Sequence, residues 1–275
     1  MGVLPAKKIA TYYNVYKEVE ATFTKNLIDG TGLVPDQVQL KCGNEFWSCA
    51  LFATSFLAAK VVMSMSQENV IKLRQANGSV SLRLCFRNTD ERGGPITFFI
   101  AGRVVNLSPY NESKDTALVS VQFTQRPPDD FIEIIGRLLD AIESSAKRKD
   151  ERILVTPESQ RKLKMLSREA VVFIQKVPRR CIVRDVAFSS AKVVLMGVSK
   201  FLLEKDATLR LDFDYPMESF MLPGKFVRGE AVQGKPGMVA LAMVFDDERV
   251  PLGYKARINE HISTLWANNR SGQAV

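Results

Sequence analysis

Arginine and lysine side chains are concentrated in the middle of this chain, where they could bind an anionic partner. Between Lys147 and Lys192 there are 13 basic and five acidic residues, whereas the rest of the chain has 25 of each. The formal net charge of +8 therefore falls entirely in this central segment. Such a concentration is typical of proteins that bind nucleic acid or a phosphorylated small ligand. A solvated linker with a basic bias would give the same count.

Two patterns stand out within the basic segment. Arg148-Lys149-Asp150-Glu151-Arg152 spaces two arginines four residues apart, and the run from Arg184 to Lys192 reads RDVAFSSAK. A guanidinium group binds a phosphate through two parallel charge-assisted hydrogen bonds. We expect Arg148 and Arg152 to lie in a linker. A linker arginine has little burial to lose, so its removal should leave folding unaffected.

Residues that usually carry out catalysis or bind metals are scarce. The four cysteines form no Cys-x-x-Cys pair, and the chain contains no nucleophile elbow, phosphate-binding loop or His-Glu-x-x-His motif. The one histidine, His261, is expected to be exposed on a C-terminal helix. These observations argue against an enzyme, a zinc site and a disulfide framework. No metal and no cofactor are expected.

Features of secreted or membrane proteins are also lacking. The most apolar stretch, residues 47–59, is shorter than the roughly 18–20 residues that a membrane-spanning helix needs. The N-terminal residues lack the apolar run of a signal peptide. We therefore expect a cytoplasmic protein with reduced cysteines and no membrane insertion.

The sequence contains an internal repeat. Residues 49–62 (CALFATSFLAAKVV) and 181–194 (CIVRDVAFSSAKVV) share six of 14 positions. Further matches follow in the same order: LRLCF at 82–86 with LRLDF at 209–213, and FFIAGRVV at 98–105 with FMLPGKFV at 220–227. The offset drifts from 132 to 122 residues, as it would if loops of different length joined equivalent strands. We infer two copies of one fold.

The repeated blocks read as short strands. Residues 208–213 alternate apolar and polar side chains, and residues 237–245 form a longer apolar strand, so each half is expected to be a β-barrel or sandwich. Apolar spacing predicts a helix over 131–142, and other helices are expected over about 9–27, from Thr156, and around Ile258–Trp266. The predicted fold is mainly β with flanking helices, in two tandem barrels each followed by a helix, with domains at 1–146 and 147–275.

Together and in this order, the two basic patterns resemble the signature of the PilZ domain family, which is Arg-x-x-x-Arg followed, after a few tens of residues, by Asp/Asn-x-Ser-x-x-Gly. The resemblance covers about residues 10–268 and is similar in arrangement to the two-barrel PilZ proteins of spirochaetes. It implies a PilZ-type barrel in each half and a non-catalytic receptor for the second messenger cyclic di-GMP. Such receptors regulate motility or related behaviour through a ligand-dependent rearrangement of their domains, and a downstream protein partner, not identified by the sequence, is implied.

The resemblance also implies a ligand site. Its residues are Arg148, Arg152, Asp185, Ala187, Ser189 and Ser190. Arginine would bind phosphate or guanine, and the Asp185 carboxylate would accept from guanine N–H groups. The sequence departs from the signature at two positions, because Ala187 replaces the serine and Ser190 replaces the glycine. Ser189 is a candidate substitute for the missing hydroxyl. The equivalent stretch of the first half, residues 53–58, lacks the aspartate and the glycine, so we expect no second site there.

Three functions stay open. The first is a cyclic di-GMP receptor, which requires Arg148 and Arg152. The second is a degenerate tandem PilZ protein that has lost the ligand and acts only as a protein-interaction module. The third, a nucleic-acid-binding barrel, would need exposed aromatic side chains among the basic ones. Only Phe173 and Phe188 lie in the segment, and both are expected in the core, so nucleic acid is the least favoured partner.

Overall fold

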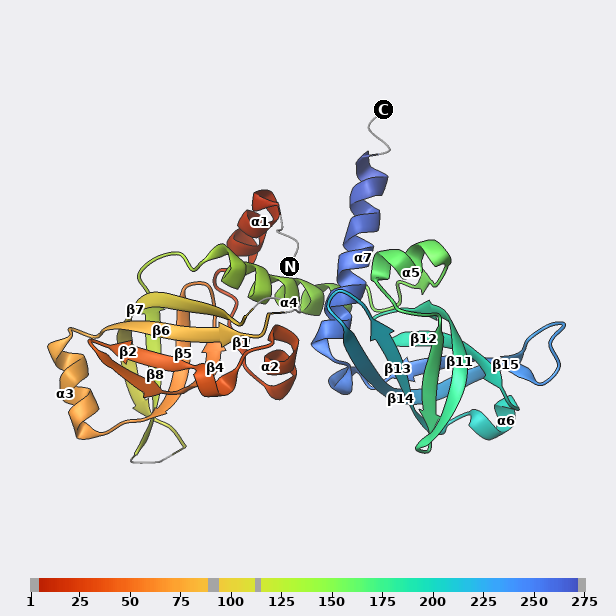
Figure 1. The fold of residues 1–275 in the computed structure, drawn as a ribbon, viewed down its shortest axis with the longest axis horizontal. Coiled ribbons are helices and arrows are strands. Elements are labelled where there is room, and N and C mark those ends of the chain that lie inside the picture. Colours follow the sequence, from red (N-terminus) through yellow and green to blue (C-terminus); the bar gives the residue numbers. More distant parts are fainter. Residues whose placement is uncertain (1–4, 89–93, 112–114, 272–275) are drawn as a thin grey trace. The chain divides into compact units, whose positions relative to one another are not determined.

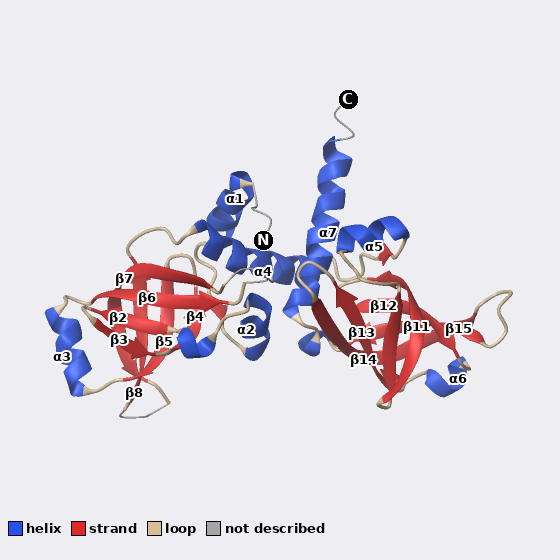
Figure 2. Ribbon diagram, in the orientation of Figure 1, coloured by secondary structure: helices blue, strands red, loops and turns tan. Residues whose placement is uncertain are grey.

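A computed structural model describes the backbone of residues 5–88, 94–111 and 115–271, and side chains as far as residue 266. The chain divides into two compact units, Met1–Leu139 and Asp140–Val275, and the division falls inside helix α4 (Asp129–Lys147) (Figure 1). Strands dominate both units and helices flank them (Figure 2). The mainly β fold with flanking helices expected from the sequence is confirmed.

The first unit is built on one antiparallel eight-stranded sheet with the order β1-β4-β5-β8-β7-β6-β2-β3. The pairings of the described residues leave β1 and β3 as the two ends of this sheet, which therefore forms a half-barrel. Its elements are α1 (Ala6–Tyr16), β1 (Ala21–Thr22), α2 (Lys25–Thr31), a 3-10 turn (Pro35–Gln37), β2 (Gln39–Cys42), β3 (Glu45–Ser48), β4 (Ala50–Thr54), β5 (Ala58–Ser64), α3 (Gln67–Gln75), β6 (Ser79–Phe86), β7 (Ile96–Pro109), β8 (Thr116–Phe123) and the start of α4.

An aromatic cluster fills the concave side of this sheet. Phe131, the third residue of α4, is fully buried, and its ring centroid lies 6.0–6.3 Å from those of Phe56, Phe86 and Phe98. Edge-to-face contacts of this kind add to the free energy of burying the rings. The apolar spacing that predicted this helix thus corresponds to the face that covers the half-barrel.

The second unit contains a closed barrel. Its strands follow the order β10-β13-β14-β15-β12-β11, and β11 pairs back onto β10 through residues 177–182, while β9 pairs with Asp185 and Val186 farther along β11. Helices α5 and α7 contact each other (Figure 2). The elements are β9 (Ile153–Leu154), α5 (Pro157–Leu163), β10 (Glu169–Ile174), β11 (Val177–Val186), β12 (Ser190–Met196), α6 (Ser199–Leu202), β13 (Asp206–Phe213), β14 (Glu218–Ala231), β15 (Met238–Phe245), a 3-10 turn (Asp247–Arg249) and α7 (Leu252–Ser271).

The repeat seen in the sequence has the same strand register in both units. The β4–β5 hairpin pairs Ala53 with Lys60, and the β11–β12 hairpin pairs Asp185 with Lys192. Each hairpin has an irregularity at the equivalent place, immediately before Ala53 in one and Asp185 in the other. The backbone position of Asp185 is therefore a property of the repeated hairpin, and the carboxylate is what distinguishes the second copy.

One expectation about the helices needs correction, and another is confirmed. The single helix expected over residues 9–27 is wrong, because α1 ends at Tyr16, β1 intervenes, and α2 starts at Lys25. The cause is a tertiary one: Ala21 and Thr22 pair with the edge of β4, and strand pairing there replaces helical hydrogen bonds. The short helix expected from Thr156 is confirmed as α5, with the Thr156 hydroxyl capping the backbone of Ser159.

Candidate functional site

An ion pair joins the Arg-x-x-x-Arg segment to the β11–β12 hairpin. The Arg152 Nη1 donates to the Asp185 Oδ1 over 2.9 Å, although the residues are 33 positions apart. The Asp185 side chain is 9% exposed and that of Arg152 is 45% exposed, so a nearly buried carboxylate is neutralised by a half-exposed guanidinium. Adjacent backbone pairing holds this contact, because β9 pairs Leu154 with Asp185 and Ile153 with Val186.

The segment that contains both arginines lies against its own barrel. The Ser189 hydroxyl donates to the carbonyl of Lys149 over 3.1 Å. The Lys149 ammonium lies 3.7 Å from the Asp247 Oδ2. The Asp247 Oδ1 accepts a hydrogen bond from Lys255 over 2.8 Å. The hydrogen bond from Lys255, ahead of the smaller contribution of Lys149, lowers the pKa of Asp247 below its ordinary value. We call the set formed by residues 148–152 and 185–190 the linker–hairpin site.

The turn of the β11–β12 hairpin contributes mainly backbone groups. Ala187 is fully buried, its N–H donates to the carbonyl of Ser190 over 2.8 Å, and its carbonyl accepts from the phenol of Tyr254 over 2.8 Å. Burial, and then the charge of Asp185, raises the pKa of Tyr254 above its ordinary value, which keeps the phenol a donor. Ser189 and Ser190 are also largely buried. The side chain of Ala187 thus has no surface for a ligand to contact.

The first unit shows what a serine does at this turn. Ser55 occupies the position equivalent to Ala187, and its hydroxyl accepts from the N–H groups of Leu57 and Ala58 over 3.1 and 3.2 Å. The serine of this turn is therefore a backbone-capping residue in the first copy. The second copy lacks that cap but gains the hydrogen bond from Tyr254 to Ala187.

Three cations that the sequence did not assign to the site, Lys192, Arg228 and Arg184, act on Glu230 of β14. Lys192 is the strand partner of Asp185 and donates to Glu230 over 2.5 Å. The hydrogen bond from Lys192 and, more weakly, the charges of Arg228 and Arg184 lower the pKa of Glu230. Arg184 and Lys192 belong to the basic segment, but no sequence signal associates Arg228 with them, because it lies on β14.

A groove of about 580 Å³ runs along one side of the barrel. It includes Val244, the strand partner of Ser190, and Phe245, whose N–H donates to the carbonyl of Ser189. The groove is therefore adjacent to the hairpin turn. Its remaining lining is Asp206, Ala207, Thr208, Pro223, Gly224, Lys225, Val227, Asp246 and Arg249.

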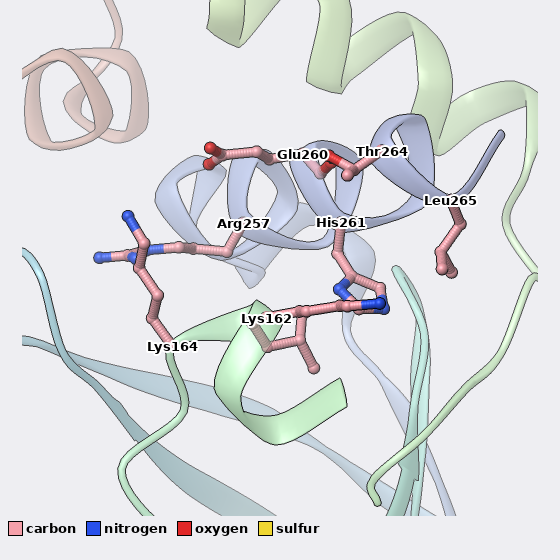
Figure 3. Close-up of a pocket in the computed structure, with 8 residues that line it drawn as sticks. Lys162, Lys164, Arg257, Glu260, His261, Thr264 and Leu265 are labelled. Carbon is pink, nitrogen blue, oxygen red and sulfur yellow. The ribbon is translucent and has the colours of Figure 1, made fainter. Parts of the chain in front are cut away.

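A smaller cavity of about 160 Å³ is bordered by α5 and α7 (Figure 3). His261 extends from α7 toward Lys162 of α5 and is only 5% exposed, so the expectation of an exposed histidine is wrong. The cations around the cavity already have protein partners. Arg257 donates to Glu218 and to three carbonyls, and Lys162 pairs with Glu158 over 2.7 Å. This arrangement stabilises the packing of α5 against α7.

Burial, with a smaller contribution from the charge of Lys162, lowers the pKa of His261 below its ordinary value of 6.5. The unfolded chain then binds a proton at a pH where the folded chain does not. We expect the free energy of unfolding to fall as the pH drops below about 6.5, because His261 titrates at its ordinary pKa only when unfolded. Urea unfolding at several pH values between 7.5 and 5.5 measures this dependence.

The matched variant is His261→Gln, which keeps a polar side chain but cannot titrate. Because His261 is the only histidine in the chain, the variant should lose the pH dependence over that range. Equal slopes for the two proteins would show that His261 is not responsible.

Other chemistry is limited in the described residues. The four cysteines are free and buried, and burial raises the pKa of Cys49 and of Cys181 to about 12, so neither thiol ionises near neutral pH. Across residues 5–88, 94–111 and 115–271 no group of three metal-binding side chains comes together. No helix within these ranges has both the length and the apolar composition needed to cross a bilayer.

Comparison with known proteins gives matches over most of the chain. The PilZN3 domain model matches residues 7–142. A Treponema denticola protein named "Cyclic di-GMP binding protein" is 36% identical over 266 residues, which cover 96% of this chain and 84% of that protein. Among solved structures, the Borreliella burgdorferi PlzA protein in complex with c-di-GMP is 21% identical with a TM-score of 0.42, covering 94% of this chain and 99% of that one. YcgR in complex with c-di-GMP from Escherichia coli is 11% identical with a TM-score of 0.29, covering 98% of each chain.

Proposed function

This chain belongs to the tandem PilZ-domain family, and from that premise we propose that it is a cyclic di-GMP receptor whose linker–hairpin site binds the nucleotide. The ion pair between Arg152 and Asp185 is the observation that carries the proposal, because it unites the two motif halves on one surface. The name of the Treponema denticola relative, a cyclic di-GMP binding protein, supports the choice of ligand.

The residue types of the site match the groups of this ligand. Cyclic di-GMP has two phosphates and two guanine bases, and arginine can bind either group with paired N–H donors. Arg152 engages one oxygen of Asp185, and a carboxylate has acceptor capacity for further donors such as the N–H groups of guanine. Arg148 and Arg152 are proposed to bind phosphate or base, and Asp185 to bind base.

Neighbouring groups extend this assignment. Arg184 directly precedes Asp185 and Lys192 is its strand partner, so both supply positive charge beside the site, which favours a ligand with two phosphates. Ser189 is proposed to hold the linker in place through the carbonyl of Lys149. Ala187 and Ser190, which depart from the signature, are proposed to shape the turn rather than to donate side-chain contacts.

The receptor is proposed to be cytoplasmic and to have no catalytic activity or cofactor. Ligand binding would immobilise the linker and so favour one arrangement of the two domains over others. A downstream protein partner would read this change, and motility is the proposed output.

One observation favours a second candidate function, an interaction module that has lost the ligand. The signature serine and glycine are replaced by Ala187 and Ser190, and both of these residues are largely buried. The two candidates differ in whether the purified protein binds the nucleotide.

Isothermal titration calorimetry of the full chain at micromolar concentration separates them. We expect heat from cyclic di-GMP and none from GTP or cyclic AMP. In a separate measurement, ligand should slow amide hydrogen exchange in residues 149–152. The amide of Val155 is an internal reference for the exchange rates, because it already donates to the carbonyl of Arg184 without ligand. No heat with cyclic di-GMP would reject the receptor in favour of the interaction module.

A further inference from the structure

The end of helix α7 contacts the segment that contains the two arginines. The indole N–H of Trp266 donates to Glu151 over 3.0 Å, although 115 positions separate the two residues. The guanidinium carbon of Arg148 lies 5.5 Å from the centroid of the Trp266 ring. One side chain of α7 thus contacts Glu151 and Arg148, two of the five residues in the Arg-x-x-x-Arg pattern. All three residues belong to the second unit.

The geometry suits a residue that holds Arg148 without using up its donors. A guanidinium group attracted to an aromatic face keeps its N–H groups available, because these lie in its own plane. Arg152 is different, because one of its N–H groups already bonds to Asp185. In the described part of the chain, no hydrogen bond or ion pair engages the guanidinium of Arg148. Its N–H donors are therefore available to an incoming anion.

Holding such an arginine in place should strengthen binding. An arginine side chain loses rotamer entropy when a ligand fixes it, and an arginine already restrained by the protein loses less on binding. The hydrogen bond between Trp266 and Glu151 restrains the ring itself, since Trp266 is 49% exposed and has few other constraints from burial.

We propose that Trp266 is a positioning residue of the linker–hairpin site, which holds Arg148 ready to bind an anionic group of the ligand. Trp266 makes this contribution through the face of its ring, and Glu151 fixes the orientation of the ring. This inference rests on the proposed function, because its effect on affinity requires that the site bind cyclic di-GMP.

The inference gives a defined order of affinities. Trp266→Ala should weaken cyclic di-GMP binding about twofold to fivefold, which is the scale of one cation–π contact at an exposed site. Trp266→Phe, which keeps an aromatic face but loses the N–H, should weaken it less. Leu265→Ala is the matched control, because Leu265 is the neighbouring exposed apolar residue of α7 and lines the cavity beside α5. Its affinity should equal that of the wild type.

A double-mutant cycle separates positioning from a general structural role. In the Arg148→Ala background, Trp266→Ala should have no further effect on affinity, because the arginine that it positions is gone. An undiminished effect in that background would mean that Trp266 acts in another way and would overturn the inference.

Fluorescence tests the contact itself without ligand. The chain has two tryptophans, so Trp47→Phe leaves Trp266 as the only one. In that background Arg148→Ala should change the emission of Trp266, whereas Lys147→Ala, which removes a neighbouring charge, should not. Unchanged emission in Arg148→Ala would overturn the contact.

The outcomes also separate the inference from the proposed function. If the wild type binds cyclic di-GMP and Trp266→Ala binds equally well, the inference fails and the receptor assignment stands. If the wild type gives no heat, the receptor assignment fails, and the role of Trp266 in binding fails with it.

Discussion

Replacing Arg148 and Arg152 together with alanine is expected to weaken cyclic di-GMP binding by about a hundredfold or more. Each arginine would supply charge-assisted hydrogen bonds, which are worth about 1.5–3 kcal/mol. A tenfold change in affinity corresponds to about 1.4 kcal/mol. Each single replacement should therefore lower the affinity for cyclic di-GMP about tenfold or more. Calorimetry of the two single variants and the double variant measures these losses directly.

The control is a double variant that removes two other arginines, and so the same charge, away from the site. Arg74→Ala/Arg161→Ala deletes two exposed cations, one on α3 and one on α5, and should leave affinity within about twofold of the wild type. Equal weakening in the control would indicate that net charge, rather than the site, attracts the ligand. If Arg148→Ala/Arg152→Ala binds with wild-type affinity, the assignment of the ligand site to these arginines is wrong.

The single variant Arg152→Ala needs a stability measurement beside its affinity. Sequence reasoning expected no effect on folding, but Arg152 neutralises the nearly buried carboxylate of Asp185. Because the arginine is half exposed, water can partly replace it, and a loss of about 1 kcal/mol in the free energy of unfolding is expected. Arg148, which makes no such pair, should give a smaller change.

The contact between Arg152 and Asp185 in the candidate site joins two patterns whose signals are local in the sequence. The spacing of Arg148 and Arg152 and the repeated hairpin both read directly from neighbouring residues, and Asp185 follows from the hairpin. Trp266 and Arg228 could not be found in this way. Trp266 of α7 meets Arg148, and Arg228 of β14 acts on the same Glu230 as Lys192, and only the three-dimensional path of the chain determines which distant side chains meet.

The errors in the fold have a similar origin. The apolar spacing of α7 identifies the face toward the barrel but cannot indicate that α5 covers another face. His261 is buried because α5 covers the face of α7 on which it lies. The half-barrel of the first unit was likewise not evident, because a strand pattern gives the alternation of side chains and not whether the last strand pairs with the first.

Gly224→Ala is expected to destabilise the second unit by about 3 kcal/mol, at the upper end of the usual cost of overpacking. A Cβ atom at this position would lie 2.1 Å from the carbonyl oxygen of Val244 and 2.8 Å from the Cα of Phe245. Both are backbone atoms of the paired strand β15, which cannot move aside without breaking the ladder. Close approach of the two strands, and not backbone conformation, requires glycine here.

The repeat supplies an independent comparison. Gly102 matches Gly224 in the sequence, and a Cβ there would lie 2.5 Å from a methyl carbon of Val121 and 2.8 Å from the carbonyl oxygen of Gln122. A side chain yields more easily than backbone, so Gly102→Ala should cost less, and its effect should fall on the first unit. Gly94→Ala, with open space around the new atom, should be neutral. Urea unfolding followed by circular dichroism gives all three values. A wild-type midpoint for Gly224→Ala would show that β14 and β15 can separate at this point, and that the glycine shared by the two copies does not reflect a packing requirement.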